Sequence, residues 1–347
     1  MPIMMIGTQR SGSNLLRLMI NQLPDVAAPH PPHILQRLMP LLPSYGDLEN
    51  PENFSTLVDD VCNLVELNPV PWEGVVLERP RIEARCRDRS LPAVFEAVYD
   101  HMAEAAGAST WCCKSLANVH YLPEIEAHFG ERVKYIYLFR DGRDVAVSFR
   151  KAVVGEKHFY HIARDWAEAQ RLALALGERV GRQRFFSVSY EELTMSPEQA
   201  MRRLCKFLGV EYQESMLAFH QSSEARRAAA SSDLWGNVTS PVMRDNSKKF
   251  LHEAGPEDIE IFESVAGEVL DRLGYKRQRL QPGEERRFSE DDIRWFDAEN
   301  ERLKQEVLGR VDPEDLERRD RQASFIRLIQ TRLMQLPPRP EGVYGER

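Results

Sequence analysis

The sequence predicts an α/β fold in which a mostly parallel, P-loop-like sheet is flanked by helices and followed by a C-terminal helical extension. Short apolar runs rich in Val, Ile, Phe and Tyr alternate with helical patterns, which is the order that forms parallel sheets covered on both faces. The first run leads directly into a Gly-containing turn. After about residue 276 the composition becomes rich in Arg and Glu. We therefore expect one domain over 1–275 and an extension over 276–347.

The expected strands are short, and two long stretches between elements have the composition of loops. Many prolines and little charge mark 24–54, which we expect to be a mobile loop, and 228–247 mixes Ser, Asn, Asp and Gly without periodicity. Ligands of parallel sheets bind beyond the carboxyl ends of the strands, so the loops after the first, third and fourth strands should share one crevice. Strands are expected at 2–6, 75–79, 109–113, 133–139 and 184–189.

The turn after the first strand is the most informative stretch of the chain. Gly7 and Gly12 keep the spacing of an ATP-type P-loop, but Ser13 and Asn14 replace its Lys-Ser/Thr pair, and Arg10 supplies a cation instead. A helix that starts at Ser13 or Asn14 aims backbone N–H groups at one point, which suits a tetrahedral anion. The competing interpretation is an ordinary strand–turn–helix with Ser as the N-cap.

A second signature lies at 133–149, where a buried-strand run is followed by a charged turn and a helical pattern. Arg140 ends the strand, and Ser148 follows eight residues later. With these motifs the chain resembles the sulfotransferases that use 3′-phosphoadenosine 5′-phosphosulfate (PAPS) and release 3′-phosphoadenosine 5′-phosphate (PAP). The resemblance implies that the first turn binds the 5′-phosphosulfate, while Arg140 and Ser148 bind the 3′-phosphate.

A third match at 184–193 extends the resemblance over about residues 3 to 275. Its Tyr-Glu-Glu-Leu run is similar to a family motif and implies that Tyr190 lies near the adenine. Lys249 before Phe250 is similar to a late Lys-Trp pair that contacts the nucleotide, although a solvated charged turn competes with this interpretation. The cofactor-binding residues that the resemblance implies are Arg10, Ser11, Gly12, Ser13, Asn14, Arg140, Ser148, Tyr190 and Lys249.

The catalytic candidates are Arg10, Lys114 and His30. The resemblance implies that Arg10 and Lys114 stabilise the transferred charge, but Leu116 stands where the cytosolic branch has its catalytic His. The Pro-Asp-Val run at 24–26 instead resembles the bacterial and tyrosylprotein branch, in which an acidic base follows a few residues later. His30 occupies about that place, and an imidazole can accept a hydroxyl proton. His33 is the second candidate, and the alternative is that both only order the proline-rich segment.

Composition excludes several classes of function. A net charge of −8 argues against nucleic-acid binding. Five cysteines give no disulfide framework, so we expect a reducing, cytoplasmic location. No run approaches the roughly 18 to 20 apolar residues of a membrane span, and no set of His, Cys, Asp and Glu has metal-ligand spacing. The resemblance implies PAPS as co-substrate and PAP as product, and the residue spacing predicts no metal.

The extension and the acceptor are the least determined parts. Apolar residues recur with 3-4 spacing at 293–307, and Asp312-Pro313 interrupts the pattern before a second helix. We expect an annex packed on the body, with a homodimer contact as the alternative. The acceptor could be a small molecule such as a phenol, a lipid, a glycan or a peptide. Two other functions compete: a P-loop kinase-like phosphotransferase, and a catalytically idle nucleotide-binding protein that recruits a partner.

Overall fold

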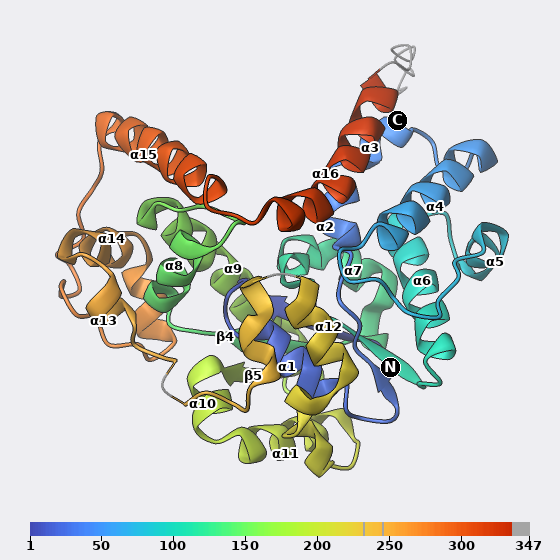
Figure 1. Cartoon of the computed structure of the whole chain (residues 1–347), viewed down its shortest axis with the longest axis horizontal. Helices are drawn as coiled ribbons and strands as arrows, with labels where there is room; N and C mark the ends of the chain where they lie inside the picture. Colours follow the sequence, from blue (N-terminus) through green and yellow to red (C-terminus); the bar gives the residue numbers. More distant parts are fainter. Residues whose placement is uncertain (232, 245, 335–347) are drawn as a thin grey trace, which may run out of the picture.

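The central sheet confirms the predicted fold class. The computed structural model describes residues 1–231, 233–244 and 246–334, and within them five parallel strands lie in the order β2-β3-β1-β4-β5 (Figure 1). Helices lie on both sides of the sheet. The strands are β1 (Ile3–Gly7), β2 (Val26–Ala27), β3 (Thr110–Cys113), β4 (Lys134–Phe139) and β5 (Phe185–Ser189).

Helices make up most of the rest of the described chain. Some begin at a side-chain N-cap: Asn50 accepts from the amide of Glu52 at 2.9 Å, and Ser90 accepts from the amide of Ala93 at 3.2 Å. The α-helices are α1 (Ser13–Ile20), α2 (Ile34–Leu38), α3 (Leu42–Tyr45), α4 (Pro51–Glu66), α5 (Arg79–Arg85), α6 (Leu91–Ala105), α7 (Leu122–Phe129), α8 (Gly142–Lys151), α9 (Phe159–Val180), α10 (Tyr190–Met195), α11 (Pro197–Leu208), α12 (Ser223–Ser231), α13 (Phe250–Glu253), α14 (Pro256–Arg272), α15 (Glu290–Leu308) and α16 (Pro313–Met334).

Alternate side chains of β1 point into two different cores, as a strand buried on both faces requires. Met4 and Ile6 pack with α4, α6, α7 and α9. Ile3 and Met5 pack with α1 and α11. The chain leaves β1 toward β2 and β3 on one side and toward β4 and β5 on the other, so the carboxyl end of β1 is a topological switch point. The loops after β1, β3 and β4 therefore meet at one edge of the sheet.

The prediction of a strand at 75–79 is wrong. Residues 75–78 are not a strand, and α5 begins at Arg79 with Pro80 in its first turn. Leu77 is buried, but Val76 is 71% exposed, whereas a strand inside a parallel sheet is buried on both faces. The edge position beside β3 is taken by β2 instead, where Val26 pairs with Thr110.

The two predicted loops are largely helical. The stretch 24–54 contains α2, α3 and the start of α4, and Ile34, Leu35 and Leu38 are buried in the core, so it is not a long loop free to move. In 228–247, α12 is followed by the 3₁₀ helix η6 (Asp233–Thr239), which leaves only 240–244 and 246–247 of the described positions without helix. Apolar side chains at 34, 35 and 38 follow helical spacing, which the prolines obscured.

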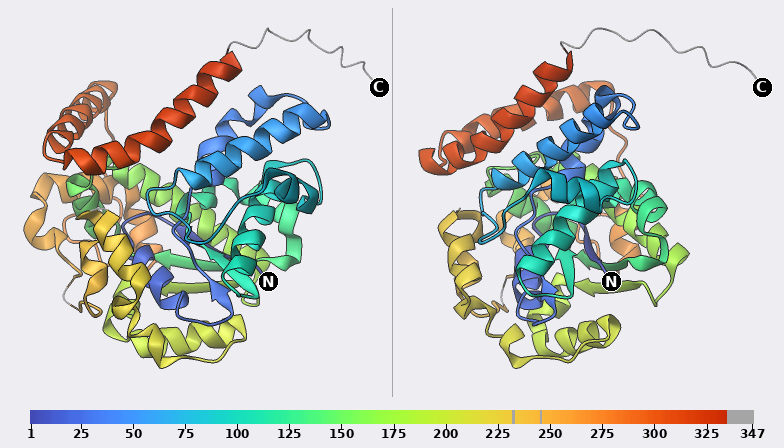
Figure 2. Two further views of the ribbon diagram at one scale, coloured as in Figure 1. Left: turned by 45° about the vertical axis from the view of Figure 1, so that its right-hand side comes forward. Right: turned by 90° about the vertical axis from the view of Figure 1, so that its right-hand side faces the viewer.

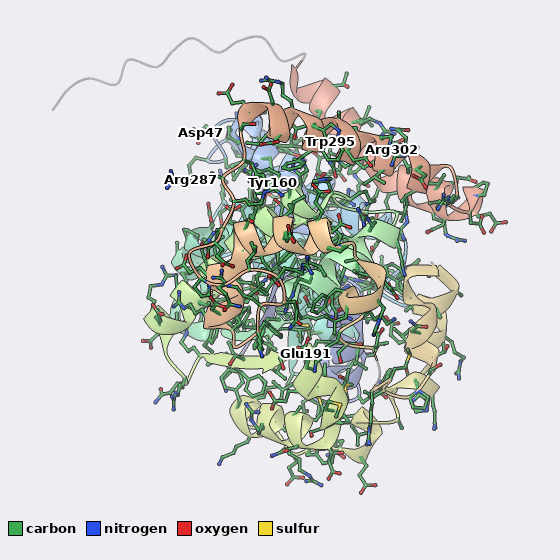
Figure 3. The ribbon with its side chains drawn as sticks, turned by 90° about the vertical axis from the view of Figure 1, so that its left-hand side faces the viewer. Asp47, Tyr160, Glu191, Arg287, Trp295 and Arg302 are labelled. Carbon is green, nitrogen blue, oxygen red and sulfur yellow. The ribbon has the colours of Figure 1, made fainter. Side chains whose placement is uncertain are left out.

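The extension forms the two expected helices, α15 and α16, which follow one another at an angle along the upper side of the molecule in Figures 1 and 2. On α15, Phe296 is buried and stacks on His158, with ring centroids 4.6 Å apart. Asn300 Oδ1 accepts the backbone N–H groups of Lys157 and His158 at 2.8 and 3.0 Å, which satisfies the start of α9. Figure 3 shows Trp295 of α15 just above Tyr160 of α9. Across the described residues, no helix has the length and apolar character needed to cross a membrane.

Candidate functional site

The turn between β1 and α1 has the backbone geometry of an anion cradle. Gly7 has φ 136°, and a Cβ there would lie 2.2 Å from the carbonyl oxygen of Leu138. Arg10 and Gly12 have φ 68° and 86°, so two left-handed residues bend the chain before α1 begins at Ser13. A turn of this kind that leads into a helix N-terminus is an arrangement that attracts anions.

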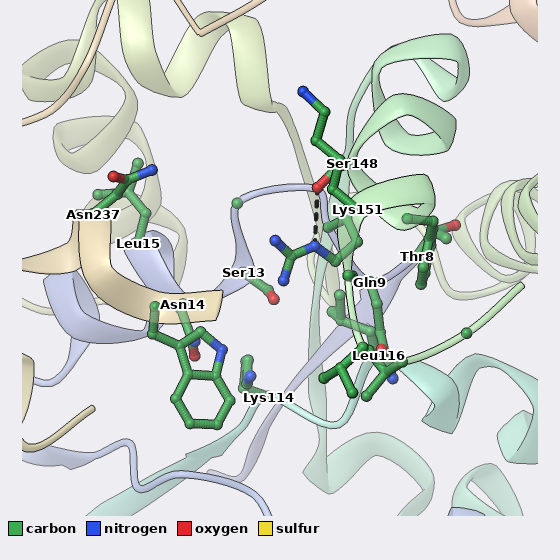
Figure 4. A pocket seen from close by; sticks show the side chains of 18 of the residues that line it. Thr8, Gln9, Ser13, Asn14, Leu15, Lys114, Leu116, Ser148, Lys151 and Asn237 are labelled. Atoms are coloured by element: carbon green, nitrogen blue, oxygen red, sulfur yellow. Dashed lines mark hydrogen bonds between the residues drawn. The ribbon is translucent and has the colours of Figure 1, made fainter. Parts of the chain in front are cut away.

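Arg10 joins this turn to helix α8. Its Nε donates to Ser148 Oγ at 3.0 Å, the dashed line in Figure 4, and its carbonyl oxygen accepts from Arg140 Nη1 at 3.2 Å. The three residues that the sequence placed in two separate motifs are thus in direct contact. Burial, and after it the positive charges of Arg140 and Arg319, lower the pKa of Arg10 to about 10. A buried guanidinium that faces other cations is a site for an anion.

Tyr190 forms the floor of the same cradle. The guanidinium carbon of Arg140 lies 4.3 Å from the centre of its ring, and its hydroxyl accepts from Asn246 Nδ2 at 2.7 Å. A Cβ on Gly12 would lie 2.4 Å from a ring carbon of Tyr190, so the ring packs directly on the turn. Arg140 Nη2 also donates to the carbonyl of Asn246 at 2.6 Å.

A buried ion-pair cluster fixes the loop that carries Arg140. Asp141 caps α8 through the amide of Arg143 and pairs with its Nη2 at 2.7 Å. Arg143 Nη1 donates to Glu263 Oε1 of α14 at 2.6 Å. Glu263 is fully buried and accepts three backbone N–H groups at 2.8 to 3.0 Å, those of 278, 279 and 280. The cluster therefore holds the end of β4, α8 and the start of the extension in one arrangement.

Lys114, His30 and His33 line the same cavity as the cradle. Burial, with the charges of Arg17 and Arg10, lowers the pKa of Lys114 to about 7. His33 has φ 60° at the start of α2, and its Nδ1 is 3.3 Å from Ser115 Oγ. Burial and the charge of Lys114 lower the pKa of His33 to about 3 and that of His30 well below its usual range.

His30 differs from His33 in its partners. It is 5% exposed, and neither ring nitrogen has a hydrogen-bond partner among the described residues. Its backbone carbonyl is held by Asn68 Nδ2 at 2.9 Å and Trp72 Nε1 at 2.7 Å, so the residue is fixed while the imidazole edge is left for another group. Its ring centre lies 4.6 Å from that of Trp235 on η6.

One large cavity of about 1280 Å³ brings these groups together. Figure 4 shows Ser13, Lys114 and Ser148 around it. Ser11 is the one residue of the predicted set that does not line the cavity, because its side chain is fully buried beneath the turn. The predicted residues that line it are Arg10, Gly12, Ser13, Asn14, His30, Lys114, Arg140, Ser148, Tyr190 and Lys249.

Sequence reasoning missed several residues of this cavity. Asp144 accepts the amides of Lys248 and Phe250 at 2.6 and 3.0 Å, which positions the segment that carries Lys249. Others come from elements whose approach no local pattern signals, among them Arg37, Asn246, Asp315, Arg319 and Gln322. Within the part of the chain that the structure describes, no group of three or more His, Cys, Asp and Glu residues could hold a metal ion.

The comparisons with known proteins decide the family. The family model described as "Sulfotransferase family" matches residues 2–214, more than half of the chain. The chain belongs to the sulfotransferase family. It is therefore a transferase that acts with sulfuryl groups, and the resemblance stated from the sequence motifs is confirmed.

Two curated relatives within this family are protein-tyrosine sulfotransferases. "Protein-tyrosine sulfotransferase A" of Caenorhabditis elegans is 24% identical over 278 residues, which cover 78% of this chain and 66% of the relative. "Protein-tyrosine sulfotransferase 2" of Gallus gallus is 23% identical over 290 residues, which cover 79% and 70%. The chain thus spans about two thirds of the length of these relatives.

Two solved structures share the sulfotransferase fold. The sulfotransferase domain from the curacin biosynthetic pathway aligns with a TM-score of 0.56 and 20% identity, covering 80% of this chain and 98% of that domain. The sulfotransferase domain from the Synechococcus PCC 7002 olefin synthase aligns with a TM-score of 0.53 and 21% identity, covering 77% of this chain and 94% of that domain. At these identities the likeness concerns the fold.

Proposed function

We propose that this sulfotransferase transfers the sulfuryl group of PAPS to a hydroxyl or amine of an acceptor and releases PAP. The observation that carries the proposal is the contact between Arg10, Arg140 and Ser148, which joins two anion-binding elements in one cavity. A nucleotide with phosphates at both its 3′ and 5′ positions needs two such elements, whereas ATP needs one. No P-loop lysine follows Gly12 to support the kinase-like alternative.

The nucleotide would occupy the cradle side of the cavity. The backbone of 11–14 and the start of α1 suit the 5′-phosphosulfate. Arg140 and Ser148 suit the 3′-phosphate, and Tyr190, which packs against Arg140, would lie near the adenine. Lys249 lines the cavity beside the segment held by Asp144 and would add charge there.

The reaction requires one bond to form as another breaks. The acceptor oxygen attacks sulfur, and the bond between sulfur and the bridging oxygen of the 5′-phosphate breaks, with its electron pair staying on PAP. Arg10 and Lys114 would stabilise the charge that grows on this leaving group. The acceptor proton would pass to a ring nitrogen of His30, which its lowered pKa keeps neutral near pH 7 and therefore able to accept a proton.

His30 is preferred to His33 as the base on contacts. Both ring nitrogens of His30 lack a partner in the described chain, whereas His33 Nδ1 already lies near Ser115 Oγ. A buried imidazole without partners is costly unless a ligand supplies them. His30→Gln should reduce transfer by about 10²–10⁴-fold at unchanged PAP binding, and His33→Gln should have a smaller effect. A larger loss in His33→Gln would move the assignment to His33.

The acceptor side has room for a second substrate. The cavity volume of about 1280 Å³ exceeds the roughly 300–1,000 Å³ of a usual ligand pocket. The names of the two curated relatives support a tyrosyl peptide or protein as acceptor. Transfer from sulfur-labelled PAPS to a tyrosyl peptide, with phenols, glycans and lipids in parallel, measures this directly. A cytoplasmic location stays a prediction.

A thermal-shift titration tests the donor. PAP should stabilise the chain by about 2.7 kcal/mol at a hundredfold excess over its Kd, and ADP and Mg²⁺-ATP should do much less. Ser148→Ala should reduce the PAP shift toward that of ADP, while Ser187→Ala, an exposed serine on β5, should leave it unchanged. A preference for ATP would favour the kinase-like function, and no shift with any nucleotide would favour the partner-binding one.

A further inference from the structure

Helix α16 of the extension contributes side chains to the same cavity as the cradle. Asp315, Arg319, Gln322 and Ala323 line it together with Arg10. Figures 1 and 2 show α16 running from α15 across the molecule toward α3. This helix lies beyond residue 214, where the match to the family model ends. The cavity therefore has a wall that the family match does not include.

The position of α16 is fixed by buried contacts with the body of the protein. Gln322 Nε2 donates to the carbonyl of Leu64 in α4 at 2.9 Å, and both groups are buried. About two turns further along the helix face, Ile329 is 1% exposed within the main core. Arg332 forms an ion pair with the buried Asp60 of α4. These contacts lie on the side of α16 that faces the body, so the wall is a packed element of the fold.

Arg319 holds the central place on this wall. Its Nε donates to Asp315 Oδ1 at 3.0 Å, one helical turn earlier, and Asp315 is itself buried. Its guanidinium carbon lies 5.9 Å from the ring centre of Trp235, which also contacts the imidazole of His30. The positive charge of Arg319 also reaches Arg10 across the cavity. Arg319 thus lines the same cavity as the proposed base and the cation of the cradle, and Trp235 contacts both Arg319 and His30.

We propose that Arg319 of the extension binds the sulfuryl oxygens of PAPS, as a second guanidinium opposite Arg10. This rests on the proposed function. Arg10, Lys114 and Arg319 bring three cationic side chains to one cavity, and the carboxylate of Asp315 pairs with Arg319. A sulfuryl group has three terminal oxygens, so it can accept hydrogen bonds from two sides at once. Donors already placed on both sides need no reorganisation as the sulfur moves from PAP to the acceptor.

Binding measurements with PAPS and PAP test this without knowledge of the acceptor, because PAP lacks only the sulfuryl group. Arg319→Gln, which keeps most of the side-chain length and a donor for Asp315, should weaken PAPS binding at least about tenfold and PAP binding less than about threefold. The PAPS affinity of Arg319→Lys, which keeps the charge, should lie between those of Arg319→Gln and the wild type. The control is Arg321→Ala, an exposed arginine of α16 that does not line the cavity.

The outcomes separate this inference from the proposed function. If Arg319→Gln binds PAPS as the wild type does, or loses PAP and PAPS equally, the inference is overturned while the proposed function stands. An equal loss of PAPS binding in Arg321→Ala overturns it too, because the effect would then come from the helix and not from the guanidinium. If the wild-type chain binds neither PAP nor PAPS, the proposed function itself fails.

Discussion

Gly12→Ala should separate nucleotide binding from stability, because Gly12 is both left-handed and in contact with Tyr190. Alanine at φ 86° costs about 1–2 kcal/mol in backbone strain. The new Cβ would also lie 2.4 Å from the tyrosine ring, about an ångström inside ordinary contact, so the ring must move. That movement disturbs the contact with Arg140 and the hydrogen bond from Asn246, each contributing about 0.5–1.5 kcal/mol.

The expected loss of unfolding free energy is therefore about 2–5 kcal/mol. For 347 residues this lowers Tm by only about 3–7 °C, from the usual unfolding entropy per residue. PAP affinity should fall at least about tenfold, since Tyr190 and Arg140 both lose their positions. Urea unfolding measures the first quantity and titration calorimetry with PAP measures the second.

Gly209→Ala is the matched control. Gly209 ends α11 with φ 80°, and a Cβ there meets nothing within 4 Å. Gly209→Ala should lose only about 1–2 kcal/mol of unfolding free energy, which comes from backbone strain, and it should keep wild-type PAP affinity. If Gly12→Ala keeps wild-type PAP affinity and loses no more stability than Gly209→Ala, Tyr190 does not act as the floor of a nucleotide site and the reasoning fails.

Three further predictions follow from buried groups. Burial and neighbouring guanidinium groups lower the pKa of Lys114 to about 7, so its charge is lost as pH rises through that value. The kcat/KM of the wild type should therefore fall above about pH 7, and Lys114→Arg, which stays charged, should not show this fall. A flat wild-type profile from pH 6 to 9 would contradict the assignment. Glu263→Ala leaves part of Arg143 and three backbone N–H groups unpaired, so it should lower the free energy of unfolding in urea by about 3–5 kcal/mol. Glu260→Ala, at a more exposed neighbour, should lower it by about a few tenths of a kcal/mol. Equal losses in the two variants would argue that the cluster does not stabilise the fold. Gln322→Met removes the hydrogen bond to the carbonyl of Leu64, so it should lower the free energy of unfolding by about 1–3 kcal/mol and speed amide hydrogen exchange throughout α16. Unchanged exchange would mean that this hydrogen bond does not hold the helix in place.

The parts of the fold and site that could be predicted are those written in local patterns. Three predicted strands end just before Gly7, Lys114 and Arg140. Because parallel strands bring their carboxyl ends together, these ends and the eight-residue spacing from Arg140 to Ser148 predicted that the motifs lie at one sheet edge. The segment 75–79 shows the limit: its apolar run resembles a strand, yet only its tertiary surroundings decide that Val76 faces water.

What the sequence could not predict depends on contacts between distant elements. No pattern around Trp235 signals that it meets His30, and nothing in α16 signals that Arg319 faces Arg10. β2 is two residues long, too short for a periodic signal, and is defined by its neighbour β3. The proline-rich segment hid α2 because its prolines suggested a loop, while the burial of its apolar side chains determines the helix.

The wall formed by α16 also has a consequence for how the protein matures. Arg10 and Arg319 line one cavity although more than three hundred residues separate them in the chain, so a ribosome must release nearly all of the described sequence before both walls exist. Strands β1 to β5 need only the residues up to Ser189 and can pair earlier. N-terminal segments generally fold first during synthesis. Competence to bind nucleotide should therefore arise in the order of translation, with the cradle formed before the cavity is closed.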